Sequence, residues 1–391
     1  MTIAIKKELF VCGENDFTDY INQLVLPLSM SRLRSQLSML QLVTVNTSDE
    51  SKSFGDKVKV PMPVVFGKAD KFDPAVGSQA SEIKAEGVEV QLNNQIYKEV
   101  KANDAEVMKC AANSILHSAL EGMVDALAVS LNEAVFDCYK DISNFSGVLE
   151  SINPRDKSSL IGARKGLQVN KVFNNRKMVL TNDTESDLLL ELSKVNETGD
   201  QVLVNEGFIG RKFGWDIYTD NQAPTHLAGT ASEVVGITAA GINLAGSPVL
   251  KVSSVEEGAT FVRGDILKVA GGYSLAVAAD IEADATGNVE IPVVGGLKLP
   301  VVAGTAIEVV GTHNVDLGFT PAAFMVAFRQ LETPGSTPGV EVGRMTDPLS
   351  GITLRLMRWY NPVTEATHWK LETLCGVKTI DPARAIRMGG H

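Results

Sequence analysis

The longest unbroken helical pattern in this 391-residue chain runs from Asn103 to Asp141. The stretch has no proline, a single glycine (Gly122), and many Ala, Leu, Met and Glu residues, which are strong helix formers. Apolar residues recur every three or four positions and polar residues occupy the other side, as in an amphipathic helix. Asn103 followed by Glu106 predicts its N-terminal cap. The rod would be about 57 Å long at 1.5 Å per residue.

Three interpretations of this helix compete. A membrane span is disfavoured because Glu121 and Asp125 would lie in hydrocarbon. A coiled coil is disfavoured because the apolar side is Ala-rich and has no Leu/Ile heptad seam. The favoured interpretation is a spine helix that lies across a plate-like subunit, with Gly122 as a position of close approach or mild bending.

Composition narrows the class of protein further. The chain is 44% hydrophobic and 21% charged, as in a folded protein, and its length predicts two or three structural units. A net charge of −11 argues against a dedicated nucleic-acid groove, which needs clustered Lys and Arg. The four cysteines lie far apart with no Cys-x-x-Cys, which indicates a reducing compartment. No secretory signal is evident at the N-terminus.

Residues 1–44 are predicted to form an N-terminal arm with little core of its own. We expect its apolar residues to pack on the rest of the subunit or on a neighbour. The second of its two short amphipathic patches lies among Ser and Arg residues, at Leu33, Leu37, Leu40 and Leu42.

Residues 45–100 are predicted to form an extended hairpin. Two runs alternate apolar and polar residues, as half-exposed strands do, and a Gly/Ser/Asp-rich region separates them. Pro61 and Pro63 suit only an edge strand. An ordinary surface hairpin is one interpretation, but the long span with little Leu or aromatic content favours a hairpin that projects from the body. Since such a hairpin exposes unpaired edges, we expect a neighbouring subunit to cover it.

The rest of the chain divides into segments that differ in composition and in hydrophobic periodicity. Residues 101–145 are assigned to the helix, and residues 146–228 contain both helical and strand patterns. Residues 229–311 contain no Trp, Cys, His or Met, and short Val/Ala/Gly/Ile strands recur about every ten residues, which predicts a small all-β barrel or sandwich inserted into the α/β part.

Residues 312–391 again contain both helical and strand patterns. There we predict a short helix at Ala322 to Phe328, followed by an antiparallel strand pair with Trp359 and Trp369 in its buried layer.

Motifs for catalysis or cofactor binding are not found. The chain has no phosphate-binding loop, no dinucleotide fingerprint and no Gly-x-Ser-x-Gly elbow. Its five histidines have no metal-ligand spacing, and Asp280, Glu282 and Asp284 lack the glycine and distal glutamate of an EF-hand. We therefore predict no catalytic, cofactor-binding or metal-binding residue, and no enzymatic activity.

The order of these segments resembles that of the major capsid proteins of tailed bacteriophages, whose fold (HK-ninety-seven-like, or Johnson) is shared with herpesvirus capsids and encapsulins. EGFIGRKFGWDIYTDNQAP at 206–224 and LRLMRWYNPVTEATHWKLETLCGVKTIDPARAIRM near the C-terminus are similar to family patterns. FVRGDILKVAGGYSLAVAADIEADATGNVEI resembles the inserted domain of short-tailed phage coat proteins of the Salmonella phage type.

The resemblance implies an α+β capsid fold with a spine helix, a projecting hairpin (the E-loop) and an inserted β domain. Residues 146–228 would be its axial domain, and 312–391 its returning axial and peripheral strands. It also implies a subunit that assembles into pentamers and hexamers of an icosahedral head around double-stranded DNA. The DNA would be enclosed without sequence-specific binding.

Scaffolding and portal proteins are implied as partners, and a membrane is not. The protein would be assembled in the host cytoplasm and located in the virion. Our candidates for inter-subunit contacts on the hairpin are Phe54, Val58, Val60, Val64, Val65 and Phe66. An encapsulin-like compartment is the alternative, and a hydrolase with an unrecognised site is a third hypothesis that no motif favours.

Overall fold

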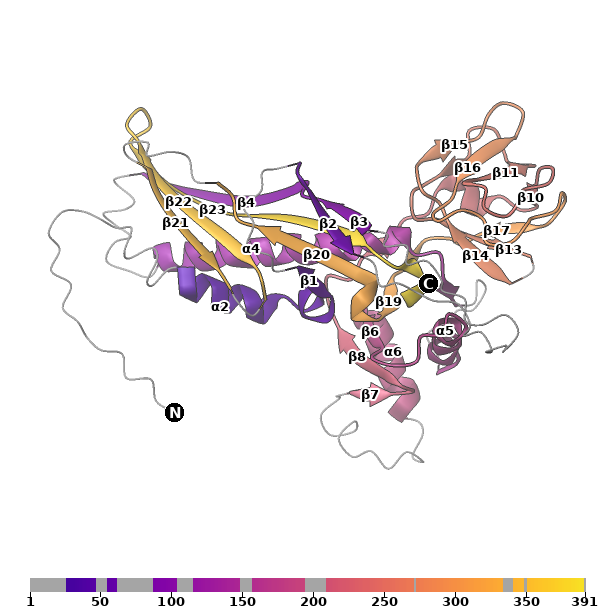
Figure 1. Ribbon diagram of the computed structural model, residues 1–391, viewed down its shortest axis with the longest axis horizontal. Coiled ribbons are helices and arrows are strands. Elements are labelled where there is room, and N and C mark those ends of the chain that lie inside the picture. The colour runs from indigo at the N-terminus through magenta and orange to yellow at the C-terminus, as the bar shows by residue number, and fades with distance from the viewer. Residues whose placement is uncertain are drawn as a thin grey trace, which may run out of the picture.

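The computed structural model describes residues 26–46, 55–61, 87–103, 115–147, 157–193, 209–270, 272–332, 340–347 and 350–389. Figure 1 shows a long sheet with helices along it, a smaller α/β unit, and a rounded β domain at the end opposite the tips of β21 and β22. Helices and many strands occur together along the chain, so the predicted α+β class is confirmed.

The large sheet is organised around β23, its longest strand at 14 residues. β20 and β22 pair in succession with one edge of β23, and β4 pairs with the other edge, all antiparallel. β21 extends the sheet beyond β22, while β1 pairs in parallel with β20. The strands are β1 (Thr44–Asn46), β4 (Asn94–Asn103), β20 (Phe324–Arg329), β21 (Val340–Thr346), β22 (Thr353–Asn361) and β23 (Ala366–Thr379).

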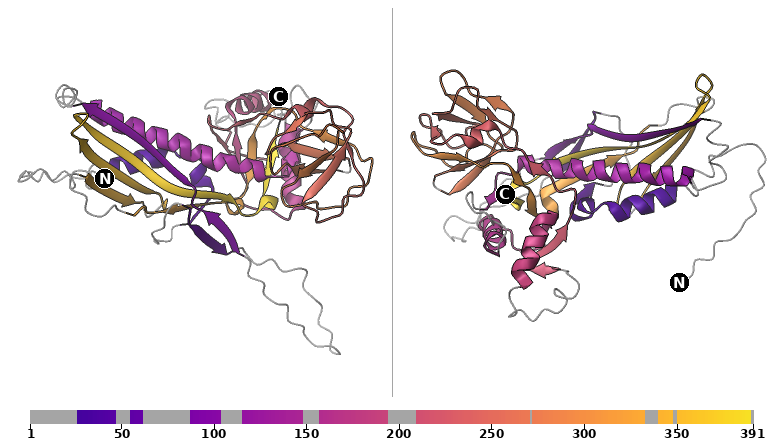
Figure 2. Two further views of the ribbon diagram at one scale, coloured as in Figure 1. Left: turned by 90° about the horizontal axis from the view of Figure 1, so that it is seen from above. Right: turned by 180° about the vertical axis from the view of Figure 1, so that it is seen from behind.

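Helices α4 (Ile115–Phe136) and α2 (Leu26–Gln36) lie along one face of this sheet (Figures 1 and 2). α4 buries residues at a spacing of four, which places them on one side of a 3.6-residue helix. These residues are Met123, Leu127, Leu131 and Val135. They share one core with α2 and the sheet, and Arg32 of α2 closes the outer edge by pairing with Asp125 at 2.7 Å and Glu121 at 3.1 Å.

The ends of these helices refine the sequence prediction. α4 is followed by a 3-10 turn, η3 (Asp137–Asp141), so the C-terminal end lies close to the predicted one. Asn103, the predicted cap, is the last residue of β4, and residues 104–114 lie outside the described part of the chain. The four leucines of the predicted arm are buried in α2, in η2 (Met39–Leu42) or just beside them, within the chain's own core.

The smaller α/β unit contains a second six-stranded sheet in the order β5-β24-β19-β6-β8-β7. Its strands are β5 (Phe145–Ser146), β6 (Lys177–Leu180), β7 (Arg211–Lys212), β8 (Trp215–Thr219), β19 (Asp316–Phe319) and β24 (Ala385–Met388). Helix α5 (Lys157–Val169) lies very close to it, because a Cβ added at Gly166 would meet Ile386 Cδ1 at 2.6 Å. Helix α6 (Asn182–Ser193) follows β6, and η6 (Pro382–Arg384) precedes β24.

The β domain has a core of its own. Every buried residue of that core lies between Ala231 and Val309. Its strands pair in small antiparallel sheets. They are β10 (Thr238–Ala239), β11 (Val249–Ser253), β12 (Thr260–Phe261), β13 (Ile266–Val269), β14 (Tyr273–Ala276), β15 (Ile281–Glu282), β16 (Val289–Pro292) and β17 (Ile307–Val309), with η4 (Thr230–Glu233) at the start. Strands β9 (Thr225–His226) and β18 (His313–Asn314) pair with each other where the chain enters and leaves it.

Two local predictions near the C-terminus are wrong. The segment predicted as a helix at Ala322 to Phe328 is a 3-10 turn, η5 (Pro321–Ala323), followed by strand β20. Trp359 does not share a layer with Trp369. Trp359 pairs with His368, the residue before Trp369, so the two-residue period of the strand puts the tryptophans on opposite faces. Trp369 is buried in the core, whereas Trp359 is half-exposed and stacks on His368 at 5.1 Å.

Candidate interaction surfaces

The hairpin predicted from the sequence is present at its base. Strands β2 (Lys57–Pro61) and β3 (Gly87–Gln91) pair antiparallel with each other and with no further strand in the described part of the chain, and Figure 2 shows them leaving the body at an angle. The returning strand ends at Gln91, not at Val100 as predicted. After Leu92 and Asn93 the chain continues as β4, which pairs with β23 over ten residues and belongs to the large sheet.

One face of the hairpin base is fixed to the chain's own body. Val58 and Val60 are 8% and 5% exposed, and they pack with Val90 and Leu92 over the sheet. The sheet residues beneath them are Ala327, Leu374 and Ile380. The contact is so close at Gly376 that an added Cβ would lie 2.4 Å from the Gln91 carbonyl oxygen. The hairpin therefore crosses β23 where β23 lacks a side chain.

The opposite face of the hairpin base is charged and exposed. Glu89 accepts from Lys57 Nζ at 2.8 Å and lies 3.9 Å from Lys59 Nζ. The hydrogen bond from Lys57, together with its charge, lowers the pKa of Glu89. Lys378 Nζ of β23 donates to the Glu89 backbone carbonyl at 3.0 Å and ties this face to the sheet.

The predicted contact residues divide into two groups. Val58 and Val60 are covered by their own chain, so at these two positions the structure differs from our expectation of a surface open to a neighbour. The reason is the two-residue period of β2, which turns both valines toward the sheet and both lysines outward. Phe54, Val64, Val65 and Phe66 lie outside the described residues.

A buried polar junction joins the β domain to the body. Tyr139 Oη lies 3.0 Å from His226 Nδ1, and His226 Nε2 lies 2.7 Å from Asp265 Oδ1. Both nitrogens of the imidazole are therefore engaged, one by the tyrosine hydroxyl and the other by the carboxylate. Asp265 also accepts from the Val262 and Gly229 backbone amides. One continuous chain of hydrogen bonds therefore links η3, β9 and the first turns of the β domain.

Arg387 supplies the positive charge beneath this junction. It is fully buried, and it donates to the Ile142 carbonyl at 3.2 Å and to the Gly264 carbonyl at 2.8 Å. Burial lowers its pKa to about 10, against the opposing charge of nearby Asp265 and Asp141. An ion pair between Arg263 and Asp141, 2.9 Å apart, closes the outer side of the junction. Body and β domain thus share buried charges as well as apolar contacts.

His313 completes the junction on its far side. Its Nδ1 lies 2.8 Å from the Gly311 carbonyl, while its Nε2 has no hydrogen-bond partner in the described structure. The ring packs edge-on to Phe145. Burial lowers the pKa of His313 to about 4. The imidazole is therefore neutral at pH 7.

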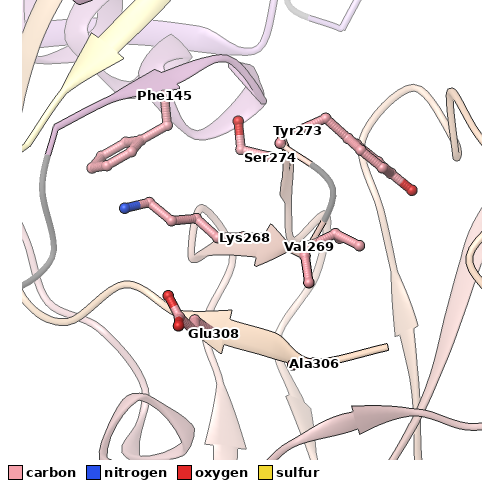
Figure 3. Close-up of a pocket in the computed structure, with 9 residues that line it drawn as sticks. Phe145, Lys268, Val269, Tyr273, Ser274, Ala306 and Glu308 are labelled. Atoms are coloured by element: carbon pink, nitrogen blue, oxygen red, sulfur yellow. The ribbon is translucent and has the colours of Figure 1, made fainter. Parts of the chain in front are cut away.

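A pocket of about 380 Å³ opens at the same seam, between β5 and the strands β13, β14 and β17. Figure 3 shows Lys268 between Phe145 and Glu308, with Tyr273 directed away from them. Lys268 Nζ lies 5.1 Å from the Phe145 ring centroid, and burial lowers its pKa while Glu308 opposes that shift. Ser274 Oγ donates to the Ser143 carbonyl at 2.5 Å. These polar groups hold the two parts together and do not form a set with nucleophile, base and orienting partner.

The described residues contain no group of three or more His, Cys, Asp and Glu side chains placed to hold a metal ion. Cys138 and Cys375 are buried, and burial raises the pKa of each thiol to about 12, so neither is a reactive thiolate. Asp284 is occupied as the acceptor of a tight turn that includes Thr286 and Asn288. In the part of the chain covered by coordinates, no helix is both long and apolar enough to cross a membrane.

Comparison with known proteins gives structural similarities. No protein-family model matches the sequence, and no curated protein matches it. Solved structures do match. "Capsid structure of the Cyanophage P-SCSP1u" covers 90% of this chain and 86% of its own, with TM-score 0.49 and 12% identity.

Two further matches have comparable scores. "Mycobacterium phage Che8" covers 85% of this chain and 84% of its own, with TM-score 0.45 and 13% identity. "Crystal structure of virus-like particle from Pyrococcus furiosus" covers 95% of this chain and 99% of its own, with TM-score 0.43 and 9% identity.

The sequence did not reveal the junction, because its members come from five distant parts of the chain. The five histidines, His226 and His313 among them, were considered only as metal ligands. One local signal was available: Asp265 follows Arg263-Gly264 directly before an apolar strand, where a carboxylate can accept from backbone amides of the preceding turn.

Proposed function

We propose that this chain is the structural subunit of a closed protein shell, and specifically a major capsid protein of a tailed-bacteriophage head. The observation that carries the proposal is the path of the hairpin. β2 and β3 cross the large sheet at Gly376 and pair with no other strand among the described residues, which leaves their outer edges for another polypeptide. The resemblance of the sequence to tailed-phage major capsid proteins adds support, because hairpin, long helix, α/β unit and β domain follow one another in the order on which that resemblance rests.

In this proposal, function is the burial of surface between copies. Each copy would contribute its hairpin to a neighbour in a pentamer or hexamer, and stable contacts of this kind bury about 1,600 Å² in total. Rotational symmetry closes each ring, because every copy then offers one surface and receives the complementary one. The long helix would keep the large sheet rigid while neighbouring copies pull on the subunit from several sides.

The net charge of −11 suits a wall that encloses DNA without binding it, because like charge repels phosphates. Scaffolding and portal proteins would direct assembly in the host cytoplasm, and the final location would be the virion. The β domain would support folding of the subunit or control the size of the shell.

Electron microscopy of the purified protein at high concentration tests the proposal. Closed shells are the expected result. Shells recovered from infected or lysogenic cells should in addition contain nuclease-protected double-stranded DNA. Shells that instead hold a cargo enzyme would favour the encapsulin-like alternative. A chain that stays monomeric under every assembly condition would contradict both.

Deletion of residues 229–311 with a short linker tests the role of the β domain. We expect fewer soluble subunits or shells of altered diameter. Unchanged yield and diameter would remove the β domain from the proposal but leave the shell function standing.

A further inference from the structure

Arg176 has a buried positive charge without a carboxylate partner among the described residues. It lies directly before β6 and is only 6% exposed. Its Nη2 donates to the Phe173 carbonyl at 2.6 Å, while Nε and Nη1 are buried and have no hydrogen-bond partner. Cζ lies 6.0 Å from the centre of the Trp215 ring. Because an uncompensated charge beneath the surface is costly, such groups are normally paired.

A second arginine near it also has no carboxylate partner in the part of the chain that the structure describes. Arg164 of α5 donates from Nη1 to the Phe213 carbonyl at 3.1 Å, and its buried Nε has no partner. Arg211 is the third basic residue here, but it has Asp216 3.4 Å away. Burial lowers the pKa of Arg176 most, and the charges of Arg164 and Arg211 lower it further. Positive charge is therefore concentrated at one place in a chain whose net charge is −11.

The turns next to the two arginines contain residues with positive φ. Both central residues of the β7–β8 turn have positive φ, 51° at Phe213 and 80° at Gly214, as a type I′ hairpin turn requires. Asn175, next to Arg176, also has a positive φ of 51°. Each guanidinium thus has one nitrogen on a backbone carbonyl, at Phe173 or Phe213, and at least one buried nitrogen without a hydrogen-bond partner among the described residues.

We propose that Arg164 and Arg176 form an oxyanion-binding site at the α5–β6–β7 corner of the α/β unit. A guanidinium presents donors in a planar fork that matches the oxygens of a carboxylate or a phosphate. Arg164 is partly exposed and lies on the solvent side, while Arg176 is covered. The ligand is a carboxylate or a phosphate, supplied either by a carboxylate side chain of another copy or as a free ion.

Thermal unfolding of the unassembled chain tests the site. At matched ionic strength, sodium phosphate should raise the Tm of the wild type by about 2–4 °C relative to sodium chloride, because a ligand of the folded state stabilises it. Arg176→Gln should lose this response and be at least as stable as the wild type in chloride, since it no longer buries an unpaired charge. Arg164→Gln, which changes a more exposed group, should also lose the response. Lys165→Gln, an exposed neighbour on α5, is the matched control and should keep it.

A wild-type Tm that responds equally to phosphate and chloride, or a phosphate response retained in both arginine variants, would overturn the site. This arm uses unassembled protein, so its outcome is independent of the proposed shell function. If phosphate raises the Tm of the wild type, the rate at which the wild type assembles into shells then identifies the source of the anion. Slowing of wild-type assembly by phosphate indicates a carboxylate from another copy, and phosphate retained in shells that assemble at the normal rate indicates a free ion.

Discussion

Lys171 shows how a single residue can carry a backbone cost. It follows α5 with φ of 61°, and its amide donates to the Gln168 carbonyl at 2.9 Å while the Val172 amide donates to the Leu167 carbonyl at 3.0 Å. This is the Schellman pattern of helix termination, in which the left-handed position is usually glycine. Val172 and Leu167 supply its apolar contact in the core of the α/β unit.

Replacing Lys171 with Gly should stabilise the protein. Removing the Cβ relieves the left-handed strain, and part of the gain is offset by greater freedom of the unfolded chain, so we expect about 0.5–1 kcal/mol. Chemical denaturation with intact cooperativity measures the change. Lys171→Ala removes the charge but keeps the Cβ, so a gain as large in that variant would attribute the effect to charge and not to backbone.

Glu372 is a buried carboxylate at the centre of the large sheet. It is fully buried and receives Arg355 Nε at 2.7 Å, Lys370 Nζ at 2.9 Å and Gln95 Nε2 at 3.0 Å. Burial alone would raise its pKa, but hydrogen bonds and charges from Lys370 and Arg355 outweigh burial, and the net pKa is lowered. The stabilisation is therefore present near neutral pH and is lost as pH falls below the ordinary carboxyl range.

Glu372→Gln should destabilise the protein by about 3 kcal/mol, because two largely buried cations lose their counter-charge. Urea denaturation at pH 7 measures this, and the difference from wild type should shrink toward pH 3. A difference that does not depend on pH would mean that packing, and not charge, explains the loss.

At the scale of elements, the hairpin base depends on one position of close approach. The Cβ of Ala at 376 would meet the Gln91 carbonyl at 2.4 Å, and a backbone atom cannot move aside as a flexible side chain can. Gly376→Ala should cost about 1–3 kcal/mol and displace β2 and β3 from the sheet. Faster hydrogen exchange at the amides of Val58 and Val90 would report the displacement.

Gly122→Ala is the matched control in a helix. The added methyl has no atom within 4 Å, so of our two interpretations of Gly122, close approach is wrong and mild bending stays a prediction. We expect a gain of about 0.5–1 kcal/mol from helix propensity. A loss at Gly122 as large as that at Gly376 would show that glycine is required for reasons other than space.

Elements with a long, regular pattern were the ones that could be predicted. The apolar side of α4 and the alternation of β22 and β23 each repeat over several periods, and both elements are present. β20 was missed because it is buried on both faces, by the helical core on one side and by the hairpin base on the other. A short run that is apolar throughout has no period, so helix and strand cannot be distinguished locally.

At the scale of the whole molecule, the junction decides how the β domain is held. No member of the Tyr139, His226 and Asp265 chain is close in sequence to another, so no local pattern predicts it. The oxyanion site has the same origin, because Arg164 and Arg176 approach only after α5 lies on the second sheet. Contacts between distant segments require the tertiary fold, which single-sequence patterns do not contain.

The junction should weaken in mild acid. The pKa of folded His313 is about 4, below the ordinary 6.5, so the unfolded state binds more protons between these values and stability falls as pH drops from 6.5 to 4. A shift of this size corresponds to roughly 3 kcal/mol at most. Calorimetry from pH 7 to pH 4 measures the loss, and His313→Gln should flatten it. His368→Gln removes a histidine of the large sheet and keeps His313, so it is the matched control and should retain the loss of stability. An equally steep slope in His313→Gln would contradict the assignment.

The pairing of β9 with β18 brings the two connections of the β domain together. Asn314 lies opposite Thr225 and His313 opposite His226, and facing Cα atoms in such a pair are about 4.5–5.5 Å apart. The whole insert therefore leaves the subunit through a neck two strands wide. A foreign domain whose termini lie equally close could be grafted there without separating the two strands of the neck.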